Sequence, residues 1–407
     1  MNQNKKPQIV IFLTVFIYLL GFGMVIPIIP MISAQYGATP FQTGALLAVY
    51  SLMQFVFSPI WGRLSDKYGR RPILLSCLFG EIFAYILFAQ SKTFETLFMA
   101  RLLSGFFGAS ISTASAYISD ITPSNERSKG MALIGAAFGL GFLFGPAIGG
   151  GLTIWADHIS PDPLFKSAFS AYWVAGLCLV TFLFAFRYLK ETLNKDLIDQ
   201  NRLSRFQALT KYFSLKTVGP LIFVFFLSSF AMSTMEATLV LFMKDRFNWG
   251  IKEVSFGFAY IGLMIVITQG VLVRRLIPKF GERNILRLGL IMMSLGFLGI
   301  GIAHSLFAMA VTQTLLAVGV GFVNPSTLGS ISLLTDQKEQ GAALGTTQSM
   351  ASLGRIGGPL LGGALYGAWK MESPFIFAGL FALIGLMVVI AIFKSIPVAG
   401  QKHAESN

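Results

Sequence analysis

Apolar runs of about 20 residues recur along the whole length of this 407-residue chain. A run of that length matches a helix that crosses the hydrocarbon core of a bilayer. Charged residues make up only 12% of the chain, against about 25% in soluble domains. The sequence therefore predicts an all-α membrane protein with twelve spans, near residues 8–31, 41–61, 73–90, 96–118, 129–153, 168–187, 217–243, 254–273, 285–303, 306–334, 341–367 and 374–394.

Lysine and arginine are unevenly divided between the two sets of connecting segments. If the N-terminus lies inside, the inner segments hold 23 of these residues and the outer segments hold 6. This asymmetry predicts cytoplasmic termini, and the short loops suggest a bacterial inner membrane. It also accounts for the net charge of +13 without a nucleic-acid partner. We expect a monomer whose partners are the lipid bilayer and a small-molecule substrate.

The chain contains an internal repeat. The segment "RLSDKYGRR" (63–71) recurs as "RLIPKFGER" (275–283), 212 residues later. In the same way "GLGFLFGPAIGG" (139–150) recurs as "SLGRIGGPLLGG" 213 residues later, and "YWVAGL" (172–177) as "FIFAGL" 203 residues later. The repeat predicts a six-helix bundle at 1–187, a basic cytoplasmic linker at 188–216, and a second bundle with a short tail at 217–407. Duplicated halves of this kind place a transporter's site near the bilayer midplane.

Several motifs resemble those of a known family. "GRLSDKYGRRP" (62–72) resembles the loop motif of the major facilitator superfamily, and "GFLFGPAIGG" (141–150) resembles its antiporter motif. "LFMARLLSGFFGA" (97–109) resembles its span-four motif, while "LGFGMVIPIIP" (20–30) and "SDITPSNERSKGMA" (119–132) are similar to its drug:proton antiporters. The resemblance, to multidrug, quinolone and tetracycline exporters, implies the major facilitator fold: two pseudo-symmetric six-helix bundles working by alternating access.

The same resemblance assigns two sets of structural residues. A conformational latch is expected at the inner face, although a basic loop that only sets topology would look similar; its residues are Gly62, Asp66, Gly69, Arg70, Arg71, Asp120 and Arg127. The second copy has Pro278 in place of the latch acid Asp66. The antiporter motif implies a bend that seals the transport path, although its small residues would also suit helix packing alone; they are Gly141, Gly145, Pro146, Gly149 and Gly150.

Four ionisable residues fall inside predicted spans, where each is a candidate functional group: Glu81, Arg101, Glu236 and Arg355. Glu236 lies in the apolar run "SSFAMSTMEATLVLFM" (228–243) and resembles, in position, the span-seven acid of multidrug exporters. A carboxyl shielded from water favours its neutral form, so proton and cationic substrate could compete for it. The alternatives are a structural pair of Glu236 with Arg355, a structural Arg101, and a Glu81 that faces lipid or stabilises Arg101.

The lining of a binding cavity can be predicted from residues near these groups. Methionine suits a pocket that repacks around different ligands, and polar groups in spans ten and eleven would add specificity. The candidates are Met232, Met235, Phe230, Gln313, Asn324 and Gln348. The two positions that carry acids in tetracycline exporters are Tyr18 and Ala84 here, which argues against a metal–tetracycline substrate.

The sequence thus predicts a proton-coupled antiporter that exports small hydrophobic or cationic compounds. The alternative is a transporter of a sugar, metabolite or lipid on the same fold, with emphasis on Arg101 and Arg355. No enzyme is expected, because no loop carries a nucleophile–base group. We expect no metal and no cofactor other than the proton as coupling ion; Cys77 and Cys178 stand apart in apolar runs. The identity of the substrate and the proton stoichiometry do not follow from the sequence.

Overall fold

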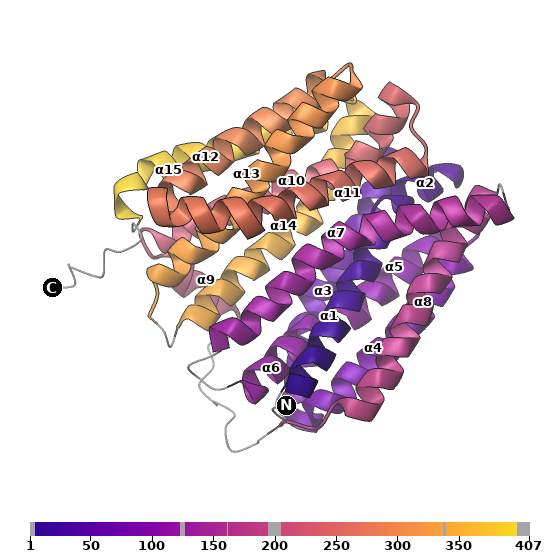
Figure 1. Ribbon diagram of the computed structural model, residues 1–407, viewed down its shortest axis with the longest axis horizontal. Coiled ribbons are helices and arrows are strands. Elements are labelled where there is room, and N and C mark those ends of the chain that lie inside the picture. The colour runs from indigo at the N-terminus through magenta and orange to yellow at the C-terminus, as the bar shows by residue number, and fades with distance from the viewer. Residues whose placement is uncertain (1–4, 123–126, 161, 194–204, 337–338, 397–407) are drawn as a thin grey trace. The chain divides into compact units, whose positions relative to one another are not determined.

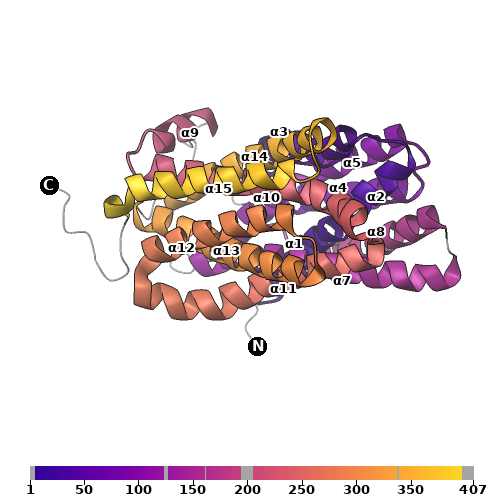
Figure 2. The same ribbon diagram turned by 90° about the horizontal axis from the view of Figure 1, so that it is seen from above.

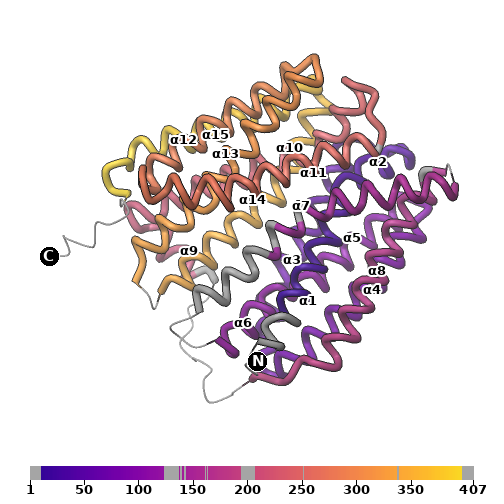
Figure 3. The backbone as a smooth tube through the Cα atoms, viewed as in Figure 1, coloured from indigo at the N-terminus to yellow at the C-terminus, as the bar shows by residue number. Residues whose placement is uncertain are grey.

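The computed structural model describes residues 5–122, 127–160, 162–193, 205–336 and 339–396, and every regular element in these ranges is a helix (Figure 1; Figure 3 draws the same path as a tube). The elements of the first part are α1 (Lys5–Val25), α2 (Ile28–Gln35), α3 (Pro40–Tyr68), α4 (Arg70–Ala89), α5 (Phe94–Gly108), α6 (Ile111–Ile121), α7 (Arg127–Ile159) and α8 (Pro163–Tyr188). They continue as α9 (Arg205–Phe213), α10 (Val218–Phe247), α11 (Ile251–Ile267), the π-helix η3 (Thr268–Val273), α12 (Arg274–Ile302), α13 (Leu306–Leu333), α14 (Gln340–Ala368), α15 (Ser373–Ala391) and the 3₁₀ turn η4 (Phe393–Ser395).

Within the described residues, eight helical stretches are long and apolar enough to cross a membrane, or nine if the bent pair α1–α2 counts as one span. One of the eight, Lys252–Ile302, is 51 residues long and contains the eighth and ninth predicted spans. The helices α7 and α14, of 33 and 29 residues, correspond to the fifth and eleventh. The protein is therefore a multi-pass helical membrane protein, and the number twelve remains a prediction.

Two predicted spans and one predicted loop differ in detail from the helices. Span one is broken between α1 and α2, with a bend of 44°, because Pro27 removes a backbone donor at the junction. Span four is divided into α5 and α6 at Ala109 and Ser110. The loop expected between spans eight and nine is helical as well, since α12 begins at Arg274 and is interrupted only at Gly281. The predicted spans and the helices differ because an apolar run shows only which residues enter lipid. Helical hydrogen bonding can continue past the end of such a run into the connecting segment.

Polar residues at the helix ends explain several boundaries. Thr39 and Gln42 form a capping box before α3: the Thr39 hydroxyl accepts from the Gln42 N–H, and the Gln42 amide accepts from the Thr39 N–H. At α8 the Asp162 carboxylate accepts from the Leu164 N–H, and at α13 the Ser305 hydroxyl accepts from the Ala308 N–H. These side chains satisfy backbone donors that a helix leaves unpaired at its first turn. The loops on these ends can therefore be short.

The chain divides into two compact units, residues 1–200 with 243–262 and residues 201–242 with 263–407. In the first unit α1 packs against α7 and α8, and α4 packs against α5 and α8 (Figure 1). In the second unit α12 packs against α13 and α15 (Figure 2). Each unit buries its own apolar contacts, including Ile11, Val15 and Tyr117 in the first and Ile285 and Phe322 in the second.

Several helix pairs make backbone contact through glycine, and two of them involve the antiporter motif and its repeat. A methyl group at Gly141 would lie 2.7 Å from Leu19 Cβ, and one at Gly145 would lie 2.8 Å from Gly23 Cα, so α7 touches the backbone of α1. A methyl group at Gly358 would lie 2.6 Å from the Phe230 carbonyl oxygen, so α14 touches α10 similarly. Small residues permit this approach in lipid, where packing rather than hydrophobicity holds helices together.

Candidate functional site

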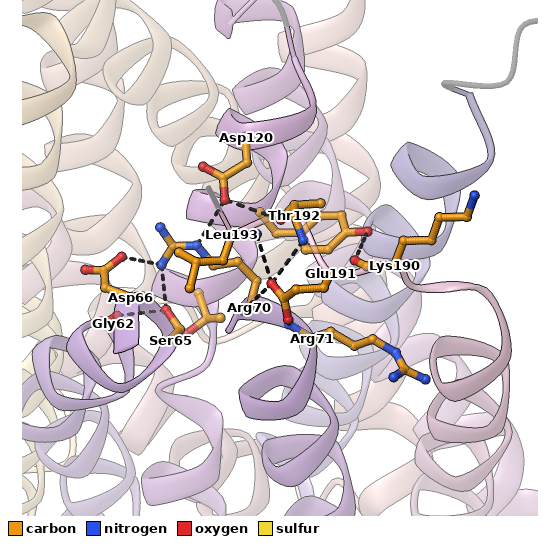
Figure 4. A network of polar contacts seen from close by, with 12 residues as sticks. Gly62, Ser65, Asp66, Arg70, Arg71, Asp120, Lys190, Glu191, Thr192 and Leu193 are labelled. Atoms are coloured by element: carbon orange, nitrogen blue, oxygen red, sulfur yellow. Dashed lines mark hydrogen bonds and ion pairs between the residues drawn. The ribbon is translucent and has the colours of Figure 1, made fainter. Parts of the chain in front are cut away.

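A network of polar contacts surrounds the turn between α3 and α4 (Figure 4). Gly69 forms this turn with a positive φ of 111°, a conformation that side chains disfavour. The next residue, Arg70, is 4% exposed; its guanidinium lies 2.6 Å from Asp66 Oδ1 and donates to Asp120 Oδ2 at 3.0 Å. It also donates to Ser65 Oγ at 2.7 Å. The buried cation therefore links α3, α4 and the end of α6.

The carboxylate of Glu191 closes the network from the segment that follows α8. It accepts hydrogen bonds from four backbone N–H groups: Arg70 at 2.8 Å, Arg71 at 3.2 Å, Thr192 at 3.0 Å and Leu193 at 2.9 Å. Partial burial opposes ionisation, but these hydrogen bonds outweigh it and lower the pKa of Glu191 below its ordinary value of 4.5. The segment after α8 is thereby fixed to the first turn of α4.

The structure brings most of the expected latch residues together. Asp66, Gly69, Arg70 and Asp120 lie in one network, and the Gly62 carbonyl accepts from Ser65 Oγ beside it. Arg71 points elsewhere: it donates to the carbonyl of Phe186 at 2.8 Å and lies over the Phe186 ring. The side chain of Arg127 lies outside the described part of the chain.

The antiporter-motif residues lie on α7 where it meets α1. Gly141, Gly145 and Gly149 face the α1 backbone near Leu19, Leu20 and Met24. Pro146 lies inside α7, which continues through it, and a methyl group at Gly23 would be 3.4 Å from its ring. Gly150 approaches Ser255, a residue of the same unit. Close packing against α1 and Ser255 therefore explains why the motif residues are small. Their role in sealing the transport path stays a prediction.

A buried polar cluster occupies the interior of the first unit. Glu81 on α4 and Arg101 on α5 are each 1% exposed. Arg101 and Ser104 act on Glu81 electrostatically, yet neither Glu81 oxygen has a hydrogen-bond partner of good geometry among the described residues. The Arg101 guanidinium lies 4.4 Å from the centre of the Tyr50 ring, and its Nη1 and Nη2 also have no such partner. Glu81 therefore faces the bundle interior rather than lipid.

Three neighbours of this cluster form a hydrogen-bonded group that the sequence did not single out. The hydroxyls of Tyr18 and Tyr50 lie 2.5 Å apart, and the Gln54 amide donates to both at 3.0 and 3.1 Å. A methyl group at Gly108 would overlap the Tyr18 hydroxyl and lie 3.2 Å from Glu81 Oε1, so this group reaches the acid. The signal available in the sequence was Gln54, a polar amide within an apolar span.

The carboxyl of Glu236 lies on α10 in the second unit. It is partly accessible within the chain, and no described residue hydrogen-bonds to it. Arg355 on α14 interacts electrostatically with the Glu236 carboxyl. The Arg355 guanidinium also donates a hydrogen bond to Ser352 Oγ at 2.8 Å. Glu236 and Arg355 therefore lie on two helices that touch through Gly354, Gly358 and Gly362, and the pairing of their side chains stays a prediction.

The predicted lining residues have different environments. Met235 is fully buried and Gln313 is 3% exposed, with its amide nitrogen unpartnered among the described residues. Phe230 packs edge-on against Phe381. Met232 and Asn324 are half-buried, and Gln348 is exposed. Met232 shares partial accessibility with Glu236 on α10, whereas Met235 belongs to the interior of the helix packing.

Comparison with known proteins adds relatives over nearly the whole chain. A family model described as Major Facilitator Superfamily matches residues 11–302 and 270–406. The class B tetracycline resistance protein of Escherichia coli is 33% identical, covering 90% of this chain and 89% of that protein. Multidrug resistance protein 1 of Bacillus subtilis is 31% identical, covering 96% and 97% of the two chains.

Two solved structures resemble the fold. The human organic anion transporter MFSD10 superposes with a TM-score of 0.71 at 25% identity, covering 96% of this chain and all of the other. A bacterial homologue of the lysosomal transporter Spinster, in an inward-facing and occupied conformation, gives a TM-score of 0.77 at 12% identity, with 95% and 96% covered. The second likeness concerns the fold alone.

Proposed function

Since this chain belongs to the Major Facilitator Superfamily, we propose that it exports small hydrophobic or cationic compounds in exchange for protons. Relatives named for tetracycline resistance and multidrug resistance support export of drug-like compounds. We place the protein in a bacterial inner membrane with both termini cytoplasmic, as the charge asymmetry of its loops predicts. The two repeated halves alternately open the site to each side.

The observation that carries this proposal is the carboxyl of Glu236, which lies in a long apolar helix without a hydrogen bond from the described residues. Placing a carboxyl inside a bilayer costs free energy, so such groups usually mark functional sites. Glu236 binds either a proton or the cationic part of a substrate, so that one leaves before the other binds. Arg355 favours release of the proton when water reaches the pair.

The proton gradient supplies enough energy for such export. One proton moving through 100 mV releases ~2.3 kcal/mol. At about 1.4 kcal/mol for each factor of ten, this sustains a concentration gradient of roughly 40-fold. A pH difference across the membrane adds to that value.

Purified protein in liposomes with an imposed pH gradient tests the assignment. A cationic dye should accumulate with the wild-type protein and with Glu81→Gln, but not with Glu236→Gln. The thermal unfolding midpoint of Glu236→Gln in detergent should match that of the wild type, which shows that the variant is folded. Equal accumulation by the two variants, or loss in Glu81→Gln alone, would remove Glu236 from its role.

A second candidate is transport of an anion, favoured by the two unpartnered Nη atoms of the buried Arg101. An anionic group could accept hydrogen bonds from both. The same liposomes, tested with an anionic dye, separate this candidate from the first: accumulation of the anionic dye alone would favour it.

A further inference from the structure

We propose that Arg283 and Arg287 on α12, together with Phe393 of η4, form a binding site for the phosphate headgroup of an anionic phospholipid. This site lies outside the transport machinery described above. It is formed where α12 resumes after Gly281 and where the chain leaves α15. The charge asymmetry of the loops predicts that this end faces the cytoplasm.

Two guanidinium groups share a single aromatic ring at this position. The Arg283 guanidinium lies 4.9 Å from the centre of the Phe393 ring, and that of Arg287 lies 5.1 Å from the same centre. Stacking on a ring offsets only part of the electrostatic repulsion between two guanidinium groups held this close. An anion bound between Arg283 and Arg287 would offset the remaining repulsion.

Neither arginine has a carboxylate counter-ion in the described part of the chain. No ion pair within 4.0 Å joins Arg283 or Arg287 to an acid there, and Arg283 Nε is shielded from water without a hydrogen-bond acceptor. The adjacent acid, Glu282, directs its side chain towards Gly329 on α13, and its Oε2 is also unpartnered. The guanidinium donors therefore remain available to a ligand.

Comparison with the equivalent turn of the first unit shows that the second turn lacks the acids that surround the first. There the cation Arg70 is held by Asp66 and Asp120, and Glu191 covers the start of α4. The three acids are replaced in the second copy, at the same offsets, by Pro278, Leu333 and Lys394. Arg70 itself is replaced by Glu282 at the same offset, yet the four replacements together make the second turn more positive by two charges. The second turn therefore attracts an anion, whereas the first turn supplies negative charge from its own side chains.

The surroundings favour a lipid over a dissolved ion. Phe280 is 55% exposed beside the arginines, and apolar helices extend from this end of α12 and α15. An aromatic ring at the membrane border lies at headgroup level, where a phosphodiester would be presented with its acyl chains along the helices. Arginine suits that phosphate because its donors form a planar fork.

Native mass spectrometry of the intact protein, titrated with phosphatidylglycerol in detergent, tests the site. Wild-type protein should bind phosphatidylglycerol more tightly than phosphatidylcholine. The variant Arg283→Gln/Arg287→Gln should lose about 25-fold in affinity, or roughly fivefold for each arginine, the factor that corresponds to ~1 kcal/mol. Phe393→Leu, which keeps both charges but removes the ring, should cause a smaller loss.

The control variant Arg274→Gln/Arg275→Gln removes two exposed cations on the other side of Gly281 and should retain wild-type affinity. Equal losses in both double variants would show attraction to general positive charge and overturn the proposal, as would undiminished affinity in Arg283→Gln/Arg287→Gln. Displacement of the lipid by a millimolar excess of inorganic phosphate would overturn the assignment to a lipid. Thermal unfolding of each variant verifies that it is folded.

Discussion

After α3 and within α12 the chain makes the same glycine turn, but the charges around the two turns differ. Gly69 and Gly281 have φ values of 111° and 77° with ψ values of 152° and 156°. Around the first turn, Arg70 and three acids form a closed network, while Glu282 replaces Arg70 at the second turn and has no ion pair among the described residues. An arginine stacks on a phenylalanine at both turns, but two arginines share the ring at the second. Duplication preserved the backbone, and the electrostatics diverged.

This difference separates two requirements that the loop motif combines. A short connection between two spans needs a residue that tolerates positive φ, and both copies have one. An ionic latch needs acids from several helices, and only the first copy has them. We infer that a latch in this protein operates in the first half alone. The second turn instead presents its arginines to the phospholipid headgroups around it. Four predictions test the contrast.

The largest effect is expected at the buried arginine of the first turn. Arg70→Gln leaves Asp66 and Asp120 without their cation and should lower the free energy of unfolding by about 3 kcal/mol, since removing one member of a buried pair isolates the other. Glu282→Gln, at the repeated position, should change it by less than about 1 kcal/mol, because Glu282 has no ion pair among the described residues. Denaturant unfolding in detergent micelles measures both. Similar losses would mean that the two turns are electrostatically equivalent.

The shared backbone predicts similar effects at the two glycines. Gly69→Ala and Gly281→Ala should each destabilise the protein by about 2 kcal/mol, because alanine is strained at these backbone angles. Gly69→Ala should have the larger effect, since its methyl group would also overlap the Glu191 carboxylate. Thermal unfolding midpoints give the comparison. A neutral Gly281→Ala would show that the second turn does not need its positive φ.

A smaller, pH-dependent effect is expected at Glu191. Because the folded protein lowers its pKa, the ionised carboxylate stabilises the fold above pH 4.5, and this contribution disappears as the pH falls through the lower folded value. Solvent screening limits it to ~1 kcal/mol at pH 7. Glu191→Gln should therefore unfold more easily than the wild type at pH 7 and match it in strong acid. A constant difference at all pH values would contradict the ionic origin.

The smallest effect is expected at an exposed ion pair of the second unit. Lys211 on α9 lies 2.5 Å from Glu339 at the start of α14, and both side chains are more than 40% exposed. Exposed pairs contribute little to stability, so Lys211→Gln should leave the unfolding midpoint within experimental error. A clear loss would indicate that α9 stabilises the second unit as strongly as the network stabilises the first.

The class of the fold was accessible from the sequence because lipid imposes a simple rule: apolar runs become helices. The span predicted at 217–243 corresponds to α10 (Val218–Phe247), and that at 306–334 to α13 (Leu306–Leu333). The break in span four and the helical start of α12 were not predicted, since hydropathy does not report backbone hydrogen bonds. The internal repeat predicted two six-helix halves, but it did not predict which helices within a half contact one another.

The candidate site was accessible in part. Carboxyl groups and arginines within apolar runs stand out because lipid disfavours them, which made Glu81, Arg101, Glu236 and Arg355 candidates whose roles stay predictions. Glu191 did not stand out, because it follows a span in a polar segment and acts through backbone donors some 120 residues earlier. Tyr18 was noted only as the replacement of an acid, and its contact with Tyr50 could not be predicted because the two hydroxyls meet only in the folded bundle.

The glycine contacts between α10 and α14 restrict how Glu236 and Arg355 can change during a transport cycle. Gly358 and Gly362 rest on the carbonyl oxygens of Phe230 and Thr234, so a larger side chain at either glycine would push α14 away from α10. The glycines thereby keep Glu236 and Arg355 on two helices in direct backbone contact. We infer that this helix pair moves as one body during transport, and that the access of water to the carboxyl is what alternates.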